Sequence, residues 1–161
     1  MNTTLSNEEL AERIAILRRF RTLLEQQRSK FQQYLQVLEQ QEQKISIQDA
    51  DAIIAHSELE AQIVEGIGSL QKVIVPMQEL CQNTNAASFN PKDAVPISHL
   101  QTDLAKLQSQ VLAQNQRNRA LLKNHISQLK TQMVTIKNPY RTARSVYAEH
   151  EPVGTLVSCN A

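Results

Sequence analysis

The sequence has few aromatic residues and few residues that turn the chain. It has no Trp, three Phe and three Tyr, so aromatic residues make up only 4% of 161 positions. Three Gly and five Pro are present. A large globular core or a β-sandwich normally draws on more aromatic and β-branched side chains, so these shortages favour another architecture. Gln, Leu, Ala, Glu, Lys and Arg fill the chain instead, and this mixture favours long helices.

Signals for secretion and for membrane insertion are also missing. Cys81 and Cys159 lie far apart and lack metal or redox spacing, which indicates a reducing, cytoplasmic setting. Residues 1–7 contain no basic segment followed by an apolar core, so the sequence predicts no signal peptide. No run of 18 apolar residues occurs, which predicts no stable membrane insertion.

Motifs for catalysis, metals and nucleic acids are absent from the sequence. None of the four His residues belongs to a metal-binding pattern such as HExxH, and His56 with Glu60, four residues apart, is read as ordinary surface pairing. No GxGxxG, GxxxxGK[ST] or GxSxG motif occurs. A basic helix is predicted over 98–137, and that helix lacks the aromatic side chains that stack on bases. We therefore expect neither an enzyme nor a nucleic-acid-binding protein, with no cofactor and no metal site.

A seven-residue repeat of apolar side chains opens the chain. Ser6 and Glu9 have the spacing of a capping box at a helix start. The repeat that follows is typical of a coiled coil or a long bundle and predicts a helix over 6–44. Its members are Leu10, Leu17, Leu24, Phe31, Leu38 and Ile45.

A second helix is predicted over 47–82, after a tight corner. Ser46 followed by Asp49 reads as its N-terminal cap. One continuous helix is the alternative, because neither Gly nor Pro marks this corner. Pro76 should kink or end the second helix, since it removes a backbone hydrogen bond.

The rest of the chain is predicted as loop, helix and tail. Asn, Ser and Pro cluster in 83–97, which predicts a loop. A third helix is expected over 98–137, with Ser98 and Gln101 as its capping box. Residues 138–161 show no helical period and should be extended or disordered. The expected fold is all-α: an elongated antiparallel, coiled-coil-like bundle of three long helices over 1–137, with a flexible C-terminal tail.

Charge is unevenly distributed along the chain although the net charge is only +1. Residues 46–103 contain two basic and eight acidic side chains, and residues 104–148 contain eight basic and none acidic. The two blocks would attract each other if their helices lie side by side. They are equally well read as solvated faces, because exposed ion pairs contribute only about 0–1 kcal/mol each.

The predicted third helix carries an apolar band near its end, formed by Leu121, Leu122, Ile126, Leu129, Met133 and Ile136. Asn115 and Asn118 fall on the same stripe just before it. They are either a buried polar layer that fixes helix register or polar contacts with a partner. The band itself is either core packing or a seat for an amphipathic helix of another protein.

Several segments of the sequence are similar to one known protein family. The string NQRNRALL, residues 115–122, resembles the N-x-x-N-x-x-L-L segment of the last helix region in the FlgN family of flagellar type III export chaperones. Residues 23–46 are similar to its first helix, and Val75-Pro76 fits the Pro near the end of its acidic second helix. The tail from residue 138 looks like the family's C-terminus, although its long basic stretch departs from the shorter family pattern.

This resemblance implies a cytosolic chaperone that binds the hook–filament junction proteins FlgK and FlgL, prevents their premature assembly and delivers them to the flagellar export gate or its ATPase. Either Tyr140 or Tyr147 would dock on the export gate. A self-associating coiled-coil scaffold without a client is the alternative. The residues expected to bind the client are Asn118, Leu121, Leu122, Ile126, Leu129, Met133 and Ile136.

Overall fold

A computed structural model of the chain describes residues 6–86 and 91–137. Its long helices are α1 (Asn7–Ser46), α2 (Ala50–Asn83) and α4 (Pro91–Lys137). No strand occurs within those two ranges. The all-α fold predicted from the sequence is therefore confirmed, and the predicted tail, 138–161, lies outside the described residues.

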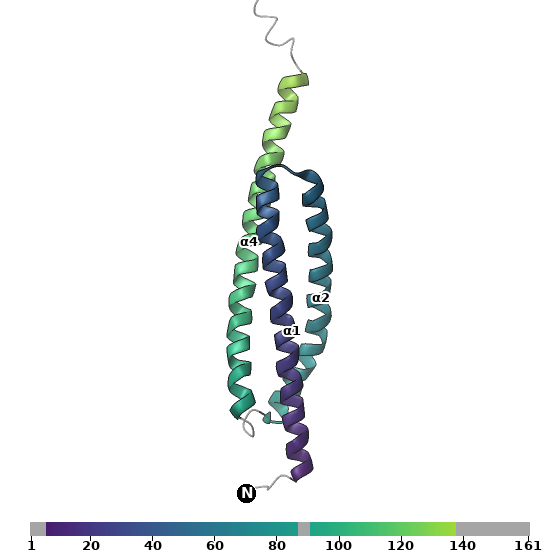
Figure 1. Cartoon of the computed structure of the whole chain (residues 1–161), viewed down its shortest axis with the longest axis vertical. Coiled ribbons are helices and arrows are strands. Elements are labelled where there is room, and N and C mark those ends of the chain that lie inside the picture. Colours follow the sequence, from purple (N-terminus) through teal and green to yellow (C-terminus); the bar gives the residue numbers. More distant parts are fainter. Residues whose placement is uncertain (1–5, 87–90, 138–161) are drawn as a thin grey trace, which may run out of the picture. The chain divides into compact units, whose positions relative to one another are not determined.

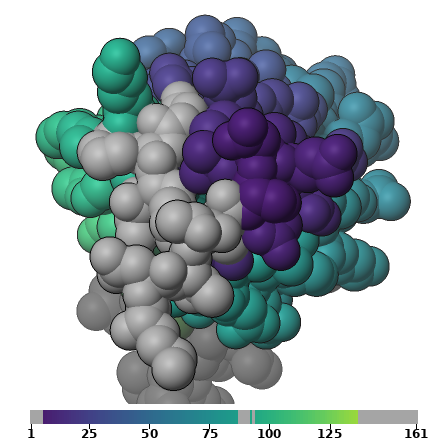
Figure 2. All heavy atoms as spheres, turned by 90° about the horizontal axis from the view of Figure 1, so that it is seen from below, coloured from purple at the N-terminus to yellow at the C-terminus, as the bar shows by residue number. Residues whose placement is uncertain are grey.

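The described residues divide into two units, one within 1–122 and the other from 123 onward. This division falls inside α4 and differs from the predicted boundary between bundle and tail. In the first unit α1, α2 and the first part of α4 run side by side (Figure 1). Seen from the end at which α1 begins, α2 and α4 lie on either side of α1 (Figure 2). The described part of the second unit is the end of α4, 123–137.

The predicted capping box starts α1. The Glu9 backbone N–H donates to the Ser6 hydroxyl at 3.2 Å, and the Ser6 N–H donates to the Glu9 carboxylate at 3.0 Å. These two bonds satisfy backbone donors that have no acceptor within the helix.

The predicted corner between α1 and α2 is confirmed, and the alternative of one continuous helix is wrong. Gln48 adopts a left-handed backbone conformation, with φ of 58°. Asp49, rather than Ser46, then caps α2 by accepting a hydrogen bond from the Ala52 N–H at 3.1 Å. The turn after α1 thus places Gln48 in the left-handed conformation that glycine usually adopts just after a helix.

α2 continues through Pro76 to Asn83, so of the two effects predicted for this proline, a kink or an end of the helix, the end does not occur. The loop predicted over 83–97 requires correction. Residues 91–97 form the start of α4, so Ser98 lies inside a helix and does not cap one. Pro91 is tolerated in the first helical turn, where its missing N–H would have had no acceptor, whereas Pro96 lies inside the helix. Residues 87–90 of the predicted loop lie outside the described residues.

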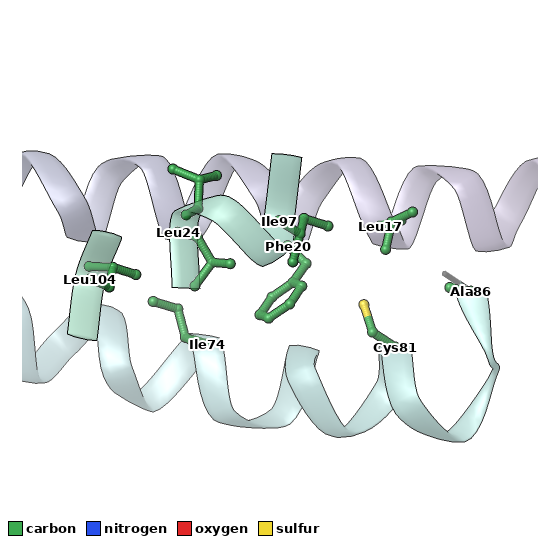
Figure 3. Packing of buried hydrophobic residues seen from close by; sticks show 9 residues of the cluster. Leu17, Phe20, Leu24, Ile74, Cys81, Ala86, Ile97 and Leu104 are labelled. Atoms are coloured by element: carbon green, nitrogen blue, oxygen red, sulfur yellow. The ribbon is translucent and has the colours of Figure 1, made fainter. Parts of the chain in front are cut away.

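All three helices contribute to the first unit's core. Figure 3 shows Leu17, Phe20 and Leu24 of α1 pointing toward Ile74 and Cys81 of α2. Ile97, Leu100 and Leu104 of α4 complete this cluster. A second cluster joins α1 to the other two helices, and its members are Tyr34, Val37, Leu38, Ile63 and Val111. The heptad repeat therefore faces the core, as predicted.

Candidate partner-binding site

One face of α4 is buried throughout the first unit. Its apolar members are each at most 7% exposed, and they recur at spacings of three, four and seven residues: Ile97, Leu100, Leu104 and Val111. Gln114 and Asn118 continue this face and are equally buried. The apolar face thus ends in a polar layer.

Asn118 lies at the centre of that polar layer and is only 3% exposed. Its side-chain amide donates to the Leu38 carbonyl at 2.8 Å and to the Gln41 side-chain oxygen at 3.0 Å. Its own oxygen accepts from the Gln114 amide at 3.0 Å. Gln114 also donates to the Glu42 carboxylate. Asn118 therefore occupies a buried polar layer between α1 and α4, and it offers no exposed contact to a partner.

A second polar contact crosses all three helices at Tyr34. Its hydroxyl donates to the Glu60 carboxylate of α2 at 2.8 Å and accepts from the Asn115 amide of α4 at 3.1 Å. Burial, reinforced by the hydrogen bond to Glu60 and by its negative charge, raises the pKa of Tyr34 to about 12. Asn115 and Arg119 offset part of this rise. The phenol therefore holds its proton as a structural donor.

Folding stability should fall as the pH rises from about 10 to about 12, because of Tyr34. The unfolded chain releases this proton near pH 10, whereas the folded chain keeps it until its pKa of about 12. In that window the unfolded state binds fewer protons, so the free energy of unfolding decreases with pH, and below pH 10 the full contribution is present. Urea unfolding at pH 9 and pH 11 should show a smaller pH-dependent loss for Tyr34→Phe than for the parent chain. Equal losses in both chains would contradict this assignment.

The polar residues of α1 that support this layer were missed by the sequence analysis, although a signal for them exists. Phe20, Gln27, Tyr34 and Gln41 recur every seven residues and are all buried. A heptad repeat has two core positions in every seven residues. These four residues fill the second position, three residues after the apolar position that begins with Leu17. Gln27 donates to the Gln71 side chain of α2 at 2.6 Å, as expected for a buried amide that needs a partner.

Leu121 and Leu122 end the first unit. Leu121 is half-buried and Leu122 is 37% exposed. Leu122 lines a small cleft of about 210 Å³ whose wall includes Ser57, Glu60 and Arg119. The two leucines predicted to bind a partner therefore differ in exposure, and Leu122 borders the polar layer.

The other predicted partner-binding residues lie in the second unit and are exposed. Ile126, Leu129, Met133 and Ile136 are 45–74% exposed, and their spacings of three and four place them on one face of α4. We call these four residues the exposed stripe. Isolated exposed apolar side chains are ordinary, but a continuous row on one helix face is typical of a protein-binding surface. Tyr140 and Tyr147 lie outside the described residues.

Within residues 6–86 and 91–137, no group of three His, Cys, Asp or Glu side chains could hold a metal ion. No helix in these ranges combines the length and the apolar character that crossing a membrane requires. Burial raises the pKa of the Cys81 thiol, which disfavours the reactive thiolate form.

The described residues form an all-α fold, and α4 carries an exposed apolar face near its end. The chain is 38% identical over 154 residues to an uncharacterized protein of Treponema pallidum (strain Nichols), and the match covers 94% of each chain. It therefore belongs to the same family as that protein. No family model matches the chain, and no solved structure resembles it significantly.

Proposed function

We propose that this protein is a cytosolic export chaperone of the FlgN type, which binds amphipathic terminal helices of the junction proteins FlgK and FlgL. The observation that carries the proposal is the exposed stripe of four apolar side chains on α4. The resemblance of residues 115–122 and 23–46 to the FlgN family supports this choice of client class. The role needs no catalytic residue, metal or cofactor, and it places the protein in the cytoplasm.

A helix-pairing surface suits the physical problem that such a client presents. An amphipathic helix that packs inside a filament exposes an apolar face before assembly, and exposed apolar faces associate with one another. A chaperone helix that covers this face removes apolar surface from water, which stabilises the complex by about 25 cal/mol for each Å² buried. Four apolar side chains bury a small area, so the complex should be reversible enough for handover at the export gate.

The proposal is tested by sedimentation of the full chain with and without purified FlgK or FlgL. A chaperone with a free helix face should sediment alone as a monomer and shift to a 1:1 complex when either client is added. Its complex should prevent the client from polymerising. A tight homodimer that neither client shifts would overturn the proposal and favour the self-associating scaffold.

A further inference from the structure

The two edges of the exposed stripe differ in charge. In coiled-coil notation the stripe fills the a and d positions of α4, and the neighbouring e and g positions line its edges. Lys123 and Lys130 occupy e and are both exposed. His125 and Gln132 occupy g, so that edge contains no Lys, Arg, Asp or Glu. The stripe therefore has one edge with two lysines and one edge without lysine.

No acidic side chain of this helix neutralises the basic edge. Asp103 is the last acidic residue before the end of α4, and the intervening stretch, 104–137, contains only basic charges. Lys123 and Lys130 lie seven residues apart, two helical turns along the same edge. A helix lying in the stripe would meet both cations on one side.

A second copy of α4 fits this edge poorly. In an antiparallel pair the e positions of the two helices face each other, so each lysine would lie beside a lysine and repel it. In a parallel pair e faces g, so each lysine would lie beside His125 or Gln132 and gain no opposite charge. The charge pattern thus disfavours antiparallel pairing of two copies through the stripe. Parallel pairing of two copies would form no ion pair at these positions.

We infer that the stripe receives a helix from another protein that carries Glu or Asp along the edge facing Lys123 and Lys130. This inference rests on the proposed function and specifies the client: an amphipathic helix with an acidic flank. Interhelical pairs at these positions set partner choice and orientation more than raw affinity. Such pairs are screened by salt, so the preference for an acidic flank weakens as ionic strength rises.

Three synthetic helical peptides test the inference. They share Leu at every a and d position and differ only at e and g, which are all Glu, all Gln or all Lys, so the comparison does not depend on orientation. Binding to the full chain is measured by fluorescence anisotropy at low and high salt. The Glu peptide should bind roughly tenfold more tightly than the Gln peptide at low salt, because it forms two exposed ion pairs with the lysines. The Lys peptide should bind most weakly.

Charge reversal supplies the decisive comparison. Lys123→Glu with Lys130→Glu should invert the order, so that the Lys peptide binds most tightly. Lys92→Glu with Lys106→Glu makes the same charge change at two exposed positions in the first unit's part of α4, and it should leave the order unchanged. Equal binding of all three peptides, or no inversion on charge reversal, would overturn the inference while leaving the proposed function standing. If no peptide bound and neither FlgK nor FlgL bound, both the inference and the proposed function would be contradicted.

Discussion

Replacing Ile126 and Met133 with Gln is expected to weaken the binding of FlgK or FlgL roughly ten- to a hundredfold. Full burial of such a side chain contributes roughly 1.5–3 kcal/mol, and because Ile126 and Met133 are already about half buried on the stripe, a client would bury about half of each, or about 0.8–1.5 kcal/mol. The two lost contributions together amount to about one to two factors of ten in Kd. Because neither side chain lies in the first unit's core, far-UV helicity and thermal stability should stay close to those of the parent chain.

Gln is chosen because it is nearly as good a helix former as the apolar residues and carries no charge. The substitution therefore separates apolar contact from the charge preference of the stripe's edge. Leu112→Gln with Val134→Gln is the matched control, since both residues are more than 60% exposed on α4 and neither belongs to the stripe. Calorimetry with purified client should show a loss only for the stripe variant. Equal losses in both variants would place the client elsewhere or reveal a general effect of the exposed apolar side chains.

The first helix could be predicted in detail because its determinants are local. The capping box needs only Ser6 and Glu9 three residues apart, and both hydrogen bonds form. The heptad repeat faces the core as its spacing requires. The corner was harder to locate, since Gln48 takes a left-handed conformation with a side chain that rarely signals one.

The start of α4 could not be read from composition. Pro91 and Pro96 lie in a segment rich in Asn, Ser and Pro, which resembles a loop in sequence. Pro91 is compatible with the first helical turn because the donor that it lacks has no acceptor there, whereas Pro96 lies inside α4 and removes one helical hydrogen bond. Composition alone does not separate a proline that breaks a helix from one that begins it.

Which part of α4 is covered could not be predicted either. Ile97 to Val111 and Ile126 to Ile136 have the same apolar spacing, yet the first set is buried and the second exposed. Periodicity identifies an apolar face, but burial depends on which other helices run alongside it, and that is a tertiary property. Asn118 shows the same limit of sequence patterns. A buried polar layer and a polar contact with a partner would both place an Asn at this position of the apolar face.

Asn118→Ala is expected to lower the free energy of unfolding by about 2–4 kcal/mol, because the change removes three buried hydrogen bonds and leaves the Gln41 side-chain oxygen without its donor. The Leu38 carbonyl loses a donor at 2.8 Å, and the side chains of Gln41 and Gln114 each lose a partner at 3.0 Å. For a chain of this length the midpoint of thermal unfolding should fall by roughly 5–15 °C. Asn124→Ala is the control, since Asn124 is exposed on the same helix and its replacement should change stability little.

The effect of Asn118→Ala on client binding should be the reverse of that of the stripe variant. At a temperature where the variant remains folded, its affinity for FlgK or FlgL should match that of the parent chain, because Asn118 faces α1 and the exposed stripe is unchanged. Ile126→Gln with Met133→Gln should lose binding and keep stability. A variant at Asn118 that kept its stability but lost its client would instead show that this amide leaves the core and contacts the client directly.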